Sequence, residues 1–571
     1  MRVRTFLPAL AVALFAVALF LPTGWYASLP KPKENLPPAP VSGATLVRLA
    51  FAVEGLLLLA VSRERKIFSI PEGERLDPEP RIGRAVAHPR LWLAGITILA
   101  AALRFWRVSS DLWLDEITTV LDYRRVSAFH VLTAYTSSNN HLLNTLAVKA
   151  MIALFGPAEW AIRLPAVLLG IAGVPALYFL ASRVLRSREA LMAALLLSVS
   201  YHHIFFSQNA RGYTGLFFWS SLGTGFFLRA LSSDRPRDWA AYLAAMLLAV
   251  ATVLYGLFLV AGQVASALAV AWSLRRQGKR VGPTAAKLAC IWGTLGLLCF
   301  HVYASIIPQV YVYLGSVYTR PSVGYAPFAR DHALELARGI AAGFGGRLVP
   351  VALVAAAFVL PGLWLYFRSH PVSLSVLVLP LVVTAAFLLL AGLRFSPRFF
   401  LWAVPAGCLL AVAIPAEIAA RFFGIRPVSG VLPAAACALL CGLSIASLPA
   451  YYSTPKQPTR ESLAWVQARR SNGDALGAVY LAKWGLRFYG PPNGLREGKE
   501  FFDVDNVGDL DALESRAGGR TVWLLVTFRR ALRLDFPDLE RRIERDFREV
   551  RSFPATVGDG GVTVLLRARA A

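Results

Sequence analysis

The chain has 571 residues, of which 56% are hydrophobic and only 16% are charged, and its mean hydropathy is +0.54. An ordinary soluble domain carries about 25% charged residues, so this composition excludes that class. The formal net charge of +25 would by itself suit a nucleic-acid partner, but most of the excess falls in short loops between apolar stretches, where membrane topology explains it.

Apolar runs near 20 residues long recur along the chain, and each can cross a ~30 Å hydrocarbon core. The first, residues 6–21, is followed by no small-residue cleavage site, so we interpret it as a retained span rather than a signal peptide. The sequence predicts a polytopic α-helical membrane protein with about 13 transmembrane helices. The further spans are expected at residues 43–61, 91–106, 164–182, 190–206, 214–230, 239–254, 257–273, 286–307, 348–367, 372–391, 399–416 and 429–448. The region 239–273 could instead be a single long helix.

Some polar and sulfur-containing residues fall inside these predicted spans. Arg48 and Glu54 share the second span, and we expect them to form a buried ion pair. All five cysteines lie in predicted spans, so we expect no disulfide in the exported segments. No Cys/His spacing resembles a zinc site, and we expect no metal.

The orientation follows from Lys and Arg in the connecting loops. With the N-terminus in the cytoplasm, the basic segments 62–90 and 274–287 both fall inside, together with the other arginine-rich short loops. The sequence then predicts a multi-pass protein of the inner (plasma) membrane. Residues 108–163 and everything after residue 450 would face outward.

The outward loop 108–163 begins with an acidic pair, Asp115 and Glu116, just past an aromatic and basic flank typical of a membrane interface. Two readings remain open for this pair. Asp115 could simply cap a short helix over residues 117–123. Alternatively, a carboxylate held at the membrane edge is a candidate for chemistry.

Other outward segments carry the remaining candidates. Asn140 and His141 stand before an apolar segment, 142–155, that we interpret as a helix on the membrane surface. Arg211 and Tyr213 follow in the next outward turn, and Arg394 and Arg398 open a later span. A lone histidine is more often structural than catalytic, and an outward arginine can be an interfacial anchor. Guanidinium groups at one face of the membrane can equally bind a phosphate bidentately, and the outer loop 308–346 has the length of a lid.

After residue 449 the chain changes character. We expect a helix at 459–470, strands at 475–481, 521–528 and 561–567, and a charged helix at 536–548. The sequence therefore predicts a small extracytoplasmic α/β domain at the C-terminus, over residues 450–571, which is long enough to bury a core of its own.

The outward motifs, taken in order, resemble a known family. Residues 112–116 (LWLDE), 139–143 (NNHLL), 155–165 (FGPAEWAIRLP) and 207–213 (SQNARGY), followed by Arg398 and Pro405, are similar to the pattern of family 39 glycosyltransferases. This family includes protein O-mannosyltransferases and the transferase that adds aminoarabinose to lipid A. The resemblance covers roughly residues 90–450. It departs from the family pattern at Leu142 and Leu143, where prolines are common.

The resemblance implies the GT-C membrane fold and an inverting glycosyltransferase that uses a polyprenyl-phosphate-linked sugar donor. It assigns Asp115 as the catalytic base and Glu116 as its positioning partner, and it requires no cofactor. Donor-binding candidates are Arg211, Tyr213, Arg394, Arg398, Asn140 and His141. The expected domains are an N-terminal two-helix extension (1–62), a catalytic membrane domain (90–449) and the outer α/β domain (450–571). The acceptor would be an extracytoplasmic protein, lipid or glycan.

A transporter or lipid flippase is the rival reading, since it would also need many helices and intramembrane charge. The sequence shows no internal repeat, and the acidic pair lies in a loop rather than near the middle of a span. Both features favour the transferase.

Overall fold

The computed structural model describes residues 2–29, 41–63, 70–72, 75–76, 79–135, 137, 139–317, 334, 337–338, 360–390, 397–423 and 430–567. Its contacts divide the chain into two compact units. The first comprises Met1–Phe105, Ser127–Ala147 and Leu164–Ser447, and the second comprises Trp106–Val126, Val148–Arg163 and Leu448–Ala571. The loop that carries Asp115 therefore belongs to the same unit as the C-terminal tail.

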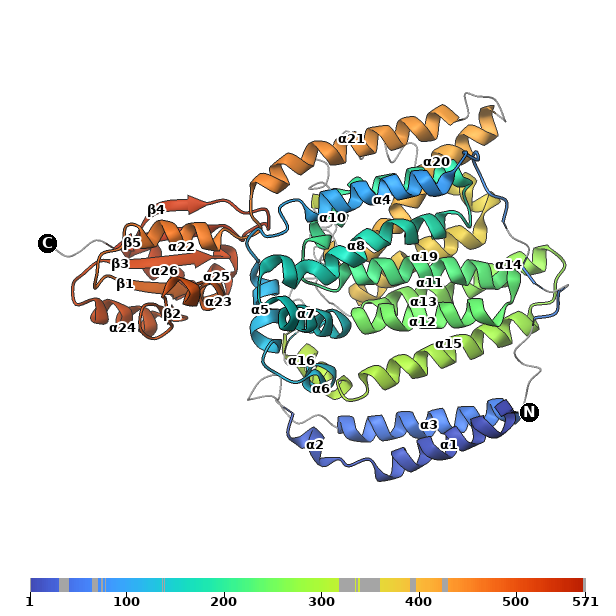
Figure 1. The fold of residues 1–571 in the computed structure, drawn as a ribbon, viewed down its shortest axis with the longest axis horizontal. Coiled ribbons are helices and arrows are strands. Elements are labelled where there is room, and N and C mark those ends of the chain that lie inside the picture. Colours follow the sequence, from blue (N-terminus) through green and yellow to red (C-terminus); the bar gives the residue numbers. More distant parts are fainter. Residues whose placement is uncertain are drawn as a thin grey trace. The chain divides into compact units, whose positions relative to one another are not determined.

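Nearly every apolar run predicted to span the membrane is a helix in the described part of the chain (Figure 1). These helices are α1 (Arg2–Phe20), α3 (Gly43–Arg63), α4 (Pro89–Phe105), α8 (Glu159–Ala181), α9 (Ser187–Val199), α10 (Tyr201–Ser207), α11 (Tyr213–Ser233), α12 (Pro236–Thr252), α13 (Gly256–Ala265), α14 (Ala267–Arg276), α15 (Gly282–Tyr303), α19 (Pro371–Leu390), α20 (Val404–Phe423) and α21 (Val431–Ser453). The predicted span 348–367 lies largely outside the described residues.

Six of the described helices are long and apolar enough to cross a membrane, and the bent pair α9–α10 would make a seventh. The chain is thus a mostly helical, multi-pass membrane protein, while the predicted total of about 13 spans stays a prediction. The region 239–273 is not a single long helix, because α12 ends at Thr252 and the candidate span Gly256–Arg276, made of α13 and α14, follows it.

The shorter helices between these spans are α2 (Gly24–Ala27), α5 (Leu114–Tyr123), α6 (Ala128–Thr133), α7 (Leu142–Phe155), α16 (Ile307–Val317) and the 3-10 helix η3 (Pro397–Ala403). Most of the predicted lid, 308–346, lies outside the described residues.

Small residues let the helices of the first unit approach closely, as is common in membranes. Gly262 of α13 faces Pro380 of α19, and an added Cβ would clash with the Pro380 backbone. Helices α11 and α12 pack along each other around a buried cluster that includes Phe227, Trp239 and Tyr242. At the other end of α11, close to Tyr213, Gly215 faces Thr252 at the end of α12.

The predicted ion pair between Arg48 and Glu54 is wrong. Both residues lie on α3, but Arg48 donates from Nε to the Leu21 carbonyl (3.1 Å), and Glu54 contacts His301 Nδ1 of α15 (2.8 Å). Residues six apart on a helix point to different faces, so each side chain finds its partner on a neighbouring segment.

A sharp bend separates α9 from α10. The two helices meet at 57° beside Ser200. Arg104 of α4 is fully buried there and donates to the carbonyls of Ser198 (2.9 Å) and Leu197 (3.2 Å). A break within a spanning helix frees carbonyls that must be satisfied inside the protein, and Arg104 does so. Gln208, just after α10, returns a hydrogen bond to the Arg104 carbonyl (2.9 Å).

The C-terminal tail folds around a five-stranded mixed sheet with strand order β2-β1-β3-β5-β4 (Figure 1). The strands are β1 (Ala475–Val479), β2 (Phe502–Val504), β3 (Val522–Thr527), β4 (Arg548–Phe553) and β5 (Val562–Arg567). Strand β1 runs parallel to β2 and β3, whereas β5 runs antiparallel to β3 and β4. The helices are α22 (Thr459–Gln467), α23 (Ala482–Tyr489), α24 (Val507–Ala517), α25 (Arg529–Asp535) and α26 (Pro537–Asp546), with the 3-10 turn η5 (Pro491–Asn493).

The predicted α/β tail is therefore present. Its predicted strands correspond to β1, β3 and β5, whose residues are mostly buried. Strands β2 and β4 were not predicted, since β2 has three residues and β4 is a charged, mostly exposed edge strand.

Candidate active site

Of the two predicted acidic residues, Glu116 has the side chain that is held more tightly. It is fully buried, and Arg163 of α8 binds it through two hydrogen bonds, Nε to Oε1 at 2.9 Å and NH2 to Oε2 at 2.7 Å. Glu116 Oε2 also accepts from the Trp113 backbone N–H (3.2 Å), which closes the first turn of α5. Both oxygens are therefore engaged, and Glu116 caps and anchors the helix.

Arg163 extends this anchoring to the preceding loop. Its NH1 group donates to the carbonyls of Val108 (2.8 Å) and Ser110 (2.7 Å), and its NH2 group donates to the carbonyl of Asp111 (2.9 Å). One buried guanidinium thus holds residues 108–111 and Glu116 in a single arrangement. A bidentate arginine–carboxylate pair with every remaining donor used is a strong geometric constraint.

Asp115 lies on the same helix turn but in a different setting. The helix α5 begins at Leu114, so Asp115 lies inside the first turn, and the residue before the helix is Trp113. Its side chain is half-buried, in contrast to Glu116. A carboxylate in the first turn of a helix is favoured by the helix dipole. Of the two acids, Asp115 is the one whose side chain is partly exposed.

The C-terminal tail holds the loop before Asp115. Arg460 of α22 binds Asp111 with its backbone N–H (2.8 Å) and its Nε (2.5 Å). Tyr489 Oη accepts from the Leu112 N–H (2.7 Å), and Gln457 Oε1 accepts from the Leu114 N–H (2.9 Å). The tail residues thereby fix three of the four residues that lead into the acidic pair.

Lys456 is a basic residue of this unit that the sequence did not single out. It is buried, and its burial lowers the pKa of the ammonium well below the usual value. The Glu116 carboxylate opposes this shift of the Lys456 pKa, and the Arg163 guanidinium reinforces it. The sequence analysis had not singled out Lys456, Arg460 or Tyr489, because no local pattern links them to residues 111–116.

In the first unit, Arg211 is the centre of a second polar cluster. It is only 3% exposed, and its NH1 group donates to Asn139 Oδ1 (2.5 Å). Its NH2 group lies 3.2 Å from His141 Nε2. Among the described residues, no carboxylate forms a salt bridge with Arg211. A buried guanidinium held by neutral groups is costly unless an anion accompanies it.

The hydrogen bonds of His141 indicate which of its ring nitrogens carries the proton. The backbone N–H of Gly212 donates to His141 Nδ1 (2.8 Å). A backbone amide can only donate, so Nδ1 must be the unprotonated nitrogen, and Nε2 of the neutral ring carries the proton. His141 Nε2 and Arg211 NH2 are then two donors facing each other. Both groups can donate a hydrogen bond to an oxygen anion.

Tyr213 packs against this pair of donors. Its ring lies edge-on to the His141 imidazole, with the centroids 5.3 Å apart, and the Arg211 guanidinium lies 5.9 Å from the ring centre. The same stretches hold several buried polar atoms with no hydrogen-bond partner in the described structure: Asn144 Oδ1, Thr145 Oγ1, both amide atoms of Asn209, and Arg211 Nε. Such a concentration indicates a place for a ligand or water.

The Asn140 side chain contacts α6 through its Nδ2 group, while its Oδ1 is buried with no hydrogen-bond partner in the described structure. Its Nδ2 donates to the carbonyls of Val131 (2.8 Å) and Ala134 (3.2 Å), which closes the end of α6, and its place in the donor site stays a prediction. The neighbouring Asn139 contacts Arg211. Of the later arginines, Arg394 lies outside the described residues, and for Arg398 only the backbone is described.

No group of three or more His, Cys, Asp or Glu side chains that could hold a metal is found among the described residues.

A segment of the chain that contains Arg211 matches a known protein family. Residues 142–313, less than half of the chain, match the model of the dolichyl-phosphate-mannose-protein mannosyltransferase family. The matched segment contains Arg211 and Tyr213. The chain resembles the protein O-mannosyltransferases. The resemblance expected from the sequence motifs is thereby confirmed.

Comparisons with other proteins add distant similarities. One is to ArnT from Cupriavidus metallidurans bound to undecaprenyl phosphate, at 15% identity over 83% of this chain and 98% of that chain, with a TM-score of 0.46. Another is to the archaeal oligosaccharyltransferase AglB from Archaeoglobus fulgidus in complex with an inhibitory peptide and a dolichol-phosphate. That similarity has 12% identity over 83% and 74% of the two chains and a TM-score of 0.45. No curated protein sequence matches the chain.

Proposed function

We propose that this protein is a membrane glycosyltransferase that moves a sugar from a polyprenyl-phosphate-linked donor to an acceptor hydroxyl, with inversion at the anomeric carbon. The observation that carries the proposal is the buried Arg211 with the His141 Nε2–H beside it, in or next to the segment that matches a mannosyltransferase family. These two donors suit a phosphate, which is the part of such a donor that every sugar shares.

In the proposed reaction the acceptor oxygen attacks the anomeric carbon, and the bond from that carbon to the phosphate oxygen breaks. The hydroxyl proton passes to Asp115, and the polyprenyl phosphate leaves with the bonding electrons. A positioned base assists the loss of the proton. The leaving group is already a phosphate, so charge stabilisation by Arg211 matters more than a general acid.

Glu116 serves this scheme as a positioning residue. Its carboxylate is fully occupied by Arg163 and the Trp113 N–H, so it fixes the first turn of α5, where Asp115 lies. Arg394, Arg398 and Asn140 remain candidates for donor binding from the sequence alone, and the Asn140 amide also supports α6.

The deciding experiment is sugar transfer by the purified protein in detergent, with radiolabelled polyprenyl-phosphate sugars as donors and membrane extracts as acceptors. We expect label to pass from the donor to a component of the extract. In detergent no transport can be scored, so a transporter or flippase would give no product. Intact donor after incubation with each sugar and every extract fraction would contradict the proposal.

A further inference from the structure

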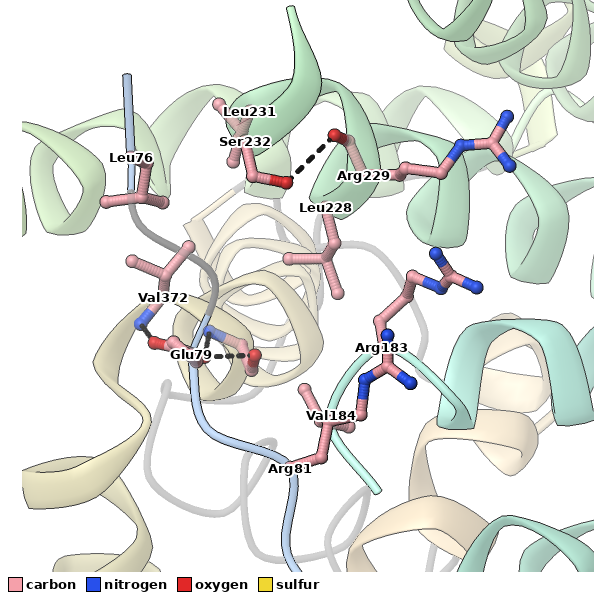
Figure 2. Close-up of a pocket in the computed structure, with 11 residues that line it drawn as sticks. Leu76, Glu79, Arg81, Arg183, Val184, Leu228, Arg229, Leu231, Ser232 and Val372 are labelled. Carbon is pink, nitrogen blue, oxygen red and sulfur yellow. Dashed lines mark hydrogen bonds between the residues drawn. The ribbon is translucent and has the colours of Figure 1, made fainter. Parts of the chain in front are cut away.

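A second group of arginines surrounds a cavity near the other end of α11. Arg211 precedes this helix, whereas Arg229 lies 18 positions later, which is about 27 Å along a helix axis. The cavity has a volume of about 130 Å³. It is lined by Leu76, Glu79, Arg81, Arg183, Val184, Leu228, Arg229, Leu231, Ser232, Val372 and Ser373 (Figure 2).

The lining is positively charged, because its one acidic residue, Glu79, binds backbone N–H groups and not the arginines. Glu79 accepts hydrogen bonds from the backbone N–H groups of Val372 (2.8 Å) and Ser373 (3.1 Å) at the start of α19. Figure 2 shows this carboxylate on the left of the cavity and the three arginine side chains, Arg81, Arg183 and Arg229, extending to the right. The helix N-terminus, not the arginines, therefore balances Glu79.

The arginines repel one another. Burial lowers the pKa of Arg183, the positive charges of Arg81 and Arg229 lower it further, and Asp238 opposes them. Arg229 binds Asp238 through its NH2 group. The Nε of Arg229 is buried and has no hydrogen-bond partner in the described structure. Mutual repulsion and an unsatisfied buried donor are both relieved by one bound anion.

We propose that this cavity binds the phosphate group of an anionic phospholipid. Its volume of about 130 Å³ leaves room for a phosphate group. Leu76, Val184 and Leu228 supply apolar wall next to the charges, as a lipid requires and free phosphate does not. Basic pockets between transmembrane helices are typical sites for anionic head groups.

The position of the cavity agrees with this occupant. Its arginines come from three segments, 62–90, 183–189 and 229–239, that the sequence assigns to the cytoplasmic side, where anionic lipids concentrate. A general inward bias of basic residues explains arginines in such loops, but it does not require three of them to converge on one cavity.

The test is lipid binding to the purified, delipidated full chain, followed by native mass spectrometry. The lipids are phosphatidylglycerol and, as the uncharged comparison, phosphatidylcholine. The variant is Arg183→Gln, and its matched control is Arg276→Gln, which removes the same charge from an exposed arginine that stacks on Trp272 (3.9 Å) outside the cavity. Inorganic phosphate and glycerol 3-phosphate serve as soluble competitors.

We expect preferential retention of phosphatidylglycerol, with affinity reduced about tenfold or more in Arg183→Gln, the loss of one charge-assisted contact. Arg276→Gln should stay within about twofold of the unmodified protein. Arg81→Gln, at an exposed position, should also weaken binding. This second variant keeps the test valid if Arg183→Gln fails to fold. Equal affinity in the Arg81, Arg183 and Arg276 variants would overturn the proposal. So would equal retention of phosphatidylcholine, or full displacement of the lipid by millimolar phosphate, which would identify a soluble ligand.

Discussion

At the scale of single residues, neighbouring acids on one helix turn have different environments. Both oxygens of Glu116 are engaged by Arg163 and the α5 backbone, while Asp115 is half-buried in the same turn. Consecutive helical residues point about 100° apart, so one side chain can be locked inside while the other stays accessible. This difference explains why we assign the base to Asp115.

Replacing Asp115 with Asn should abolish transfer and leave the protein folded. Asparagine preserves the shape and tolerates a helix N-terminus about as well as aspartate, but it cannot accept the proton of the attacking hydroxyl. Base catalysis contributes on the order of 10²–10⁴-fold, and we expect a loss of initial transfer rate in that range. The matched control is Asp122→Asn, the same change on the same helix. Near-normal transfer in Asp115→Asn would refute the assigned base.

Replacing Arg211 with Lys should weaken use of the donor, because a point charge cannot make the bidentate contact with a phosphate. Arg211→Ala should lose about 2–4 kcal/mol of transition-state stabilisation, the order seen when an anion-stabilising donor is removed. The measurements are kcat/KM for the lipid-linked donor and the yield of folded protein in the membrane. Arg125→Lys, at an exposed arginine just after α5, is the control. Reduced yield with unchanged kcat/KM would show an anchor instead.

At the scale of elements, the short helix α5 depends on segments distant in the chain. Its first turn is bound by Arg163 from α8, and its lead-in is bound by Arg460 of α22 and Tyr489 of α23. The C-terminal tail thus has a structural role in presenting Asp115, in addition to any role in acceptor selection. Leu112 is fully buried, and an unmade hydrogen bond to its N–H would cost about 1–3 kcal/mol.

The far end of α5 carries an acid that destabilises the fold at neutral pH. Burial raises the pKa of Asp122 from its ordinary value to about 6. The folded state then binds its proton more tightly than the unfolded state, so stability falls as pH rises from about 4 to about 6. Asp122→Asn should remove this cost. The shift of about 2 pKa units sets an upper limit of about 3 kcal/mol, which partial exposure reduces to about 1–2 kcal/mol.

Thermal unfolding of the purified protein in detergent measures this effect. At pH 7.5 we expect Asp122→Asn to unfold at a higher temperature than the unmodified protein, and at pH 4 we expect the two to nearly coincide. Asp538→Asn, at an exposed carboxylate of α26, controls for the change in net charge. A difference that does not depend on pH would exclude titration of Asp122 as its cause.

At the scale of the whole molecule, we expect the N-terminus inside and the C-terminal tail outside. The expectation rests on the basic bias of the loops assigned to the cytoplasm and on an odd number of spans. A reporter enzyme that is active only in the exported compartment, fused after residue 571, should be active. A second fusion within the basic loop 274–281 should be inactive. Activity of the second fusion alone would reverse the topology.

Much of the architecture could be predicted from the sequence because it depends on local properties. The length and apolarity of each run determine whether a helix can cross a membrane, and the described helices lie where those runs occur. The buried strands β1, β3 and β5 were likewise predicted from their apolar residues, whereas the edge strand β4 is stabilised by pairing with β5. The sequence also picked out Asp115, Glu116, Arg211 and His141.

The tertiary structure alone decided what those residues contact. It shows that Arg163 holds Glu116, that Asn139 rather than Asn140 binds Arg211, that Glu54 pairs with His301, and that arginines from three loops line one cavity. The partners in these contacts lie up to 247 positions apart in the chain. Apolar periodicity reports which face of an element is buried, but the partner of a polar group depends on how distant segments pack, and no local pattern encodes that.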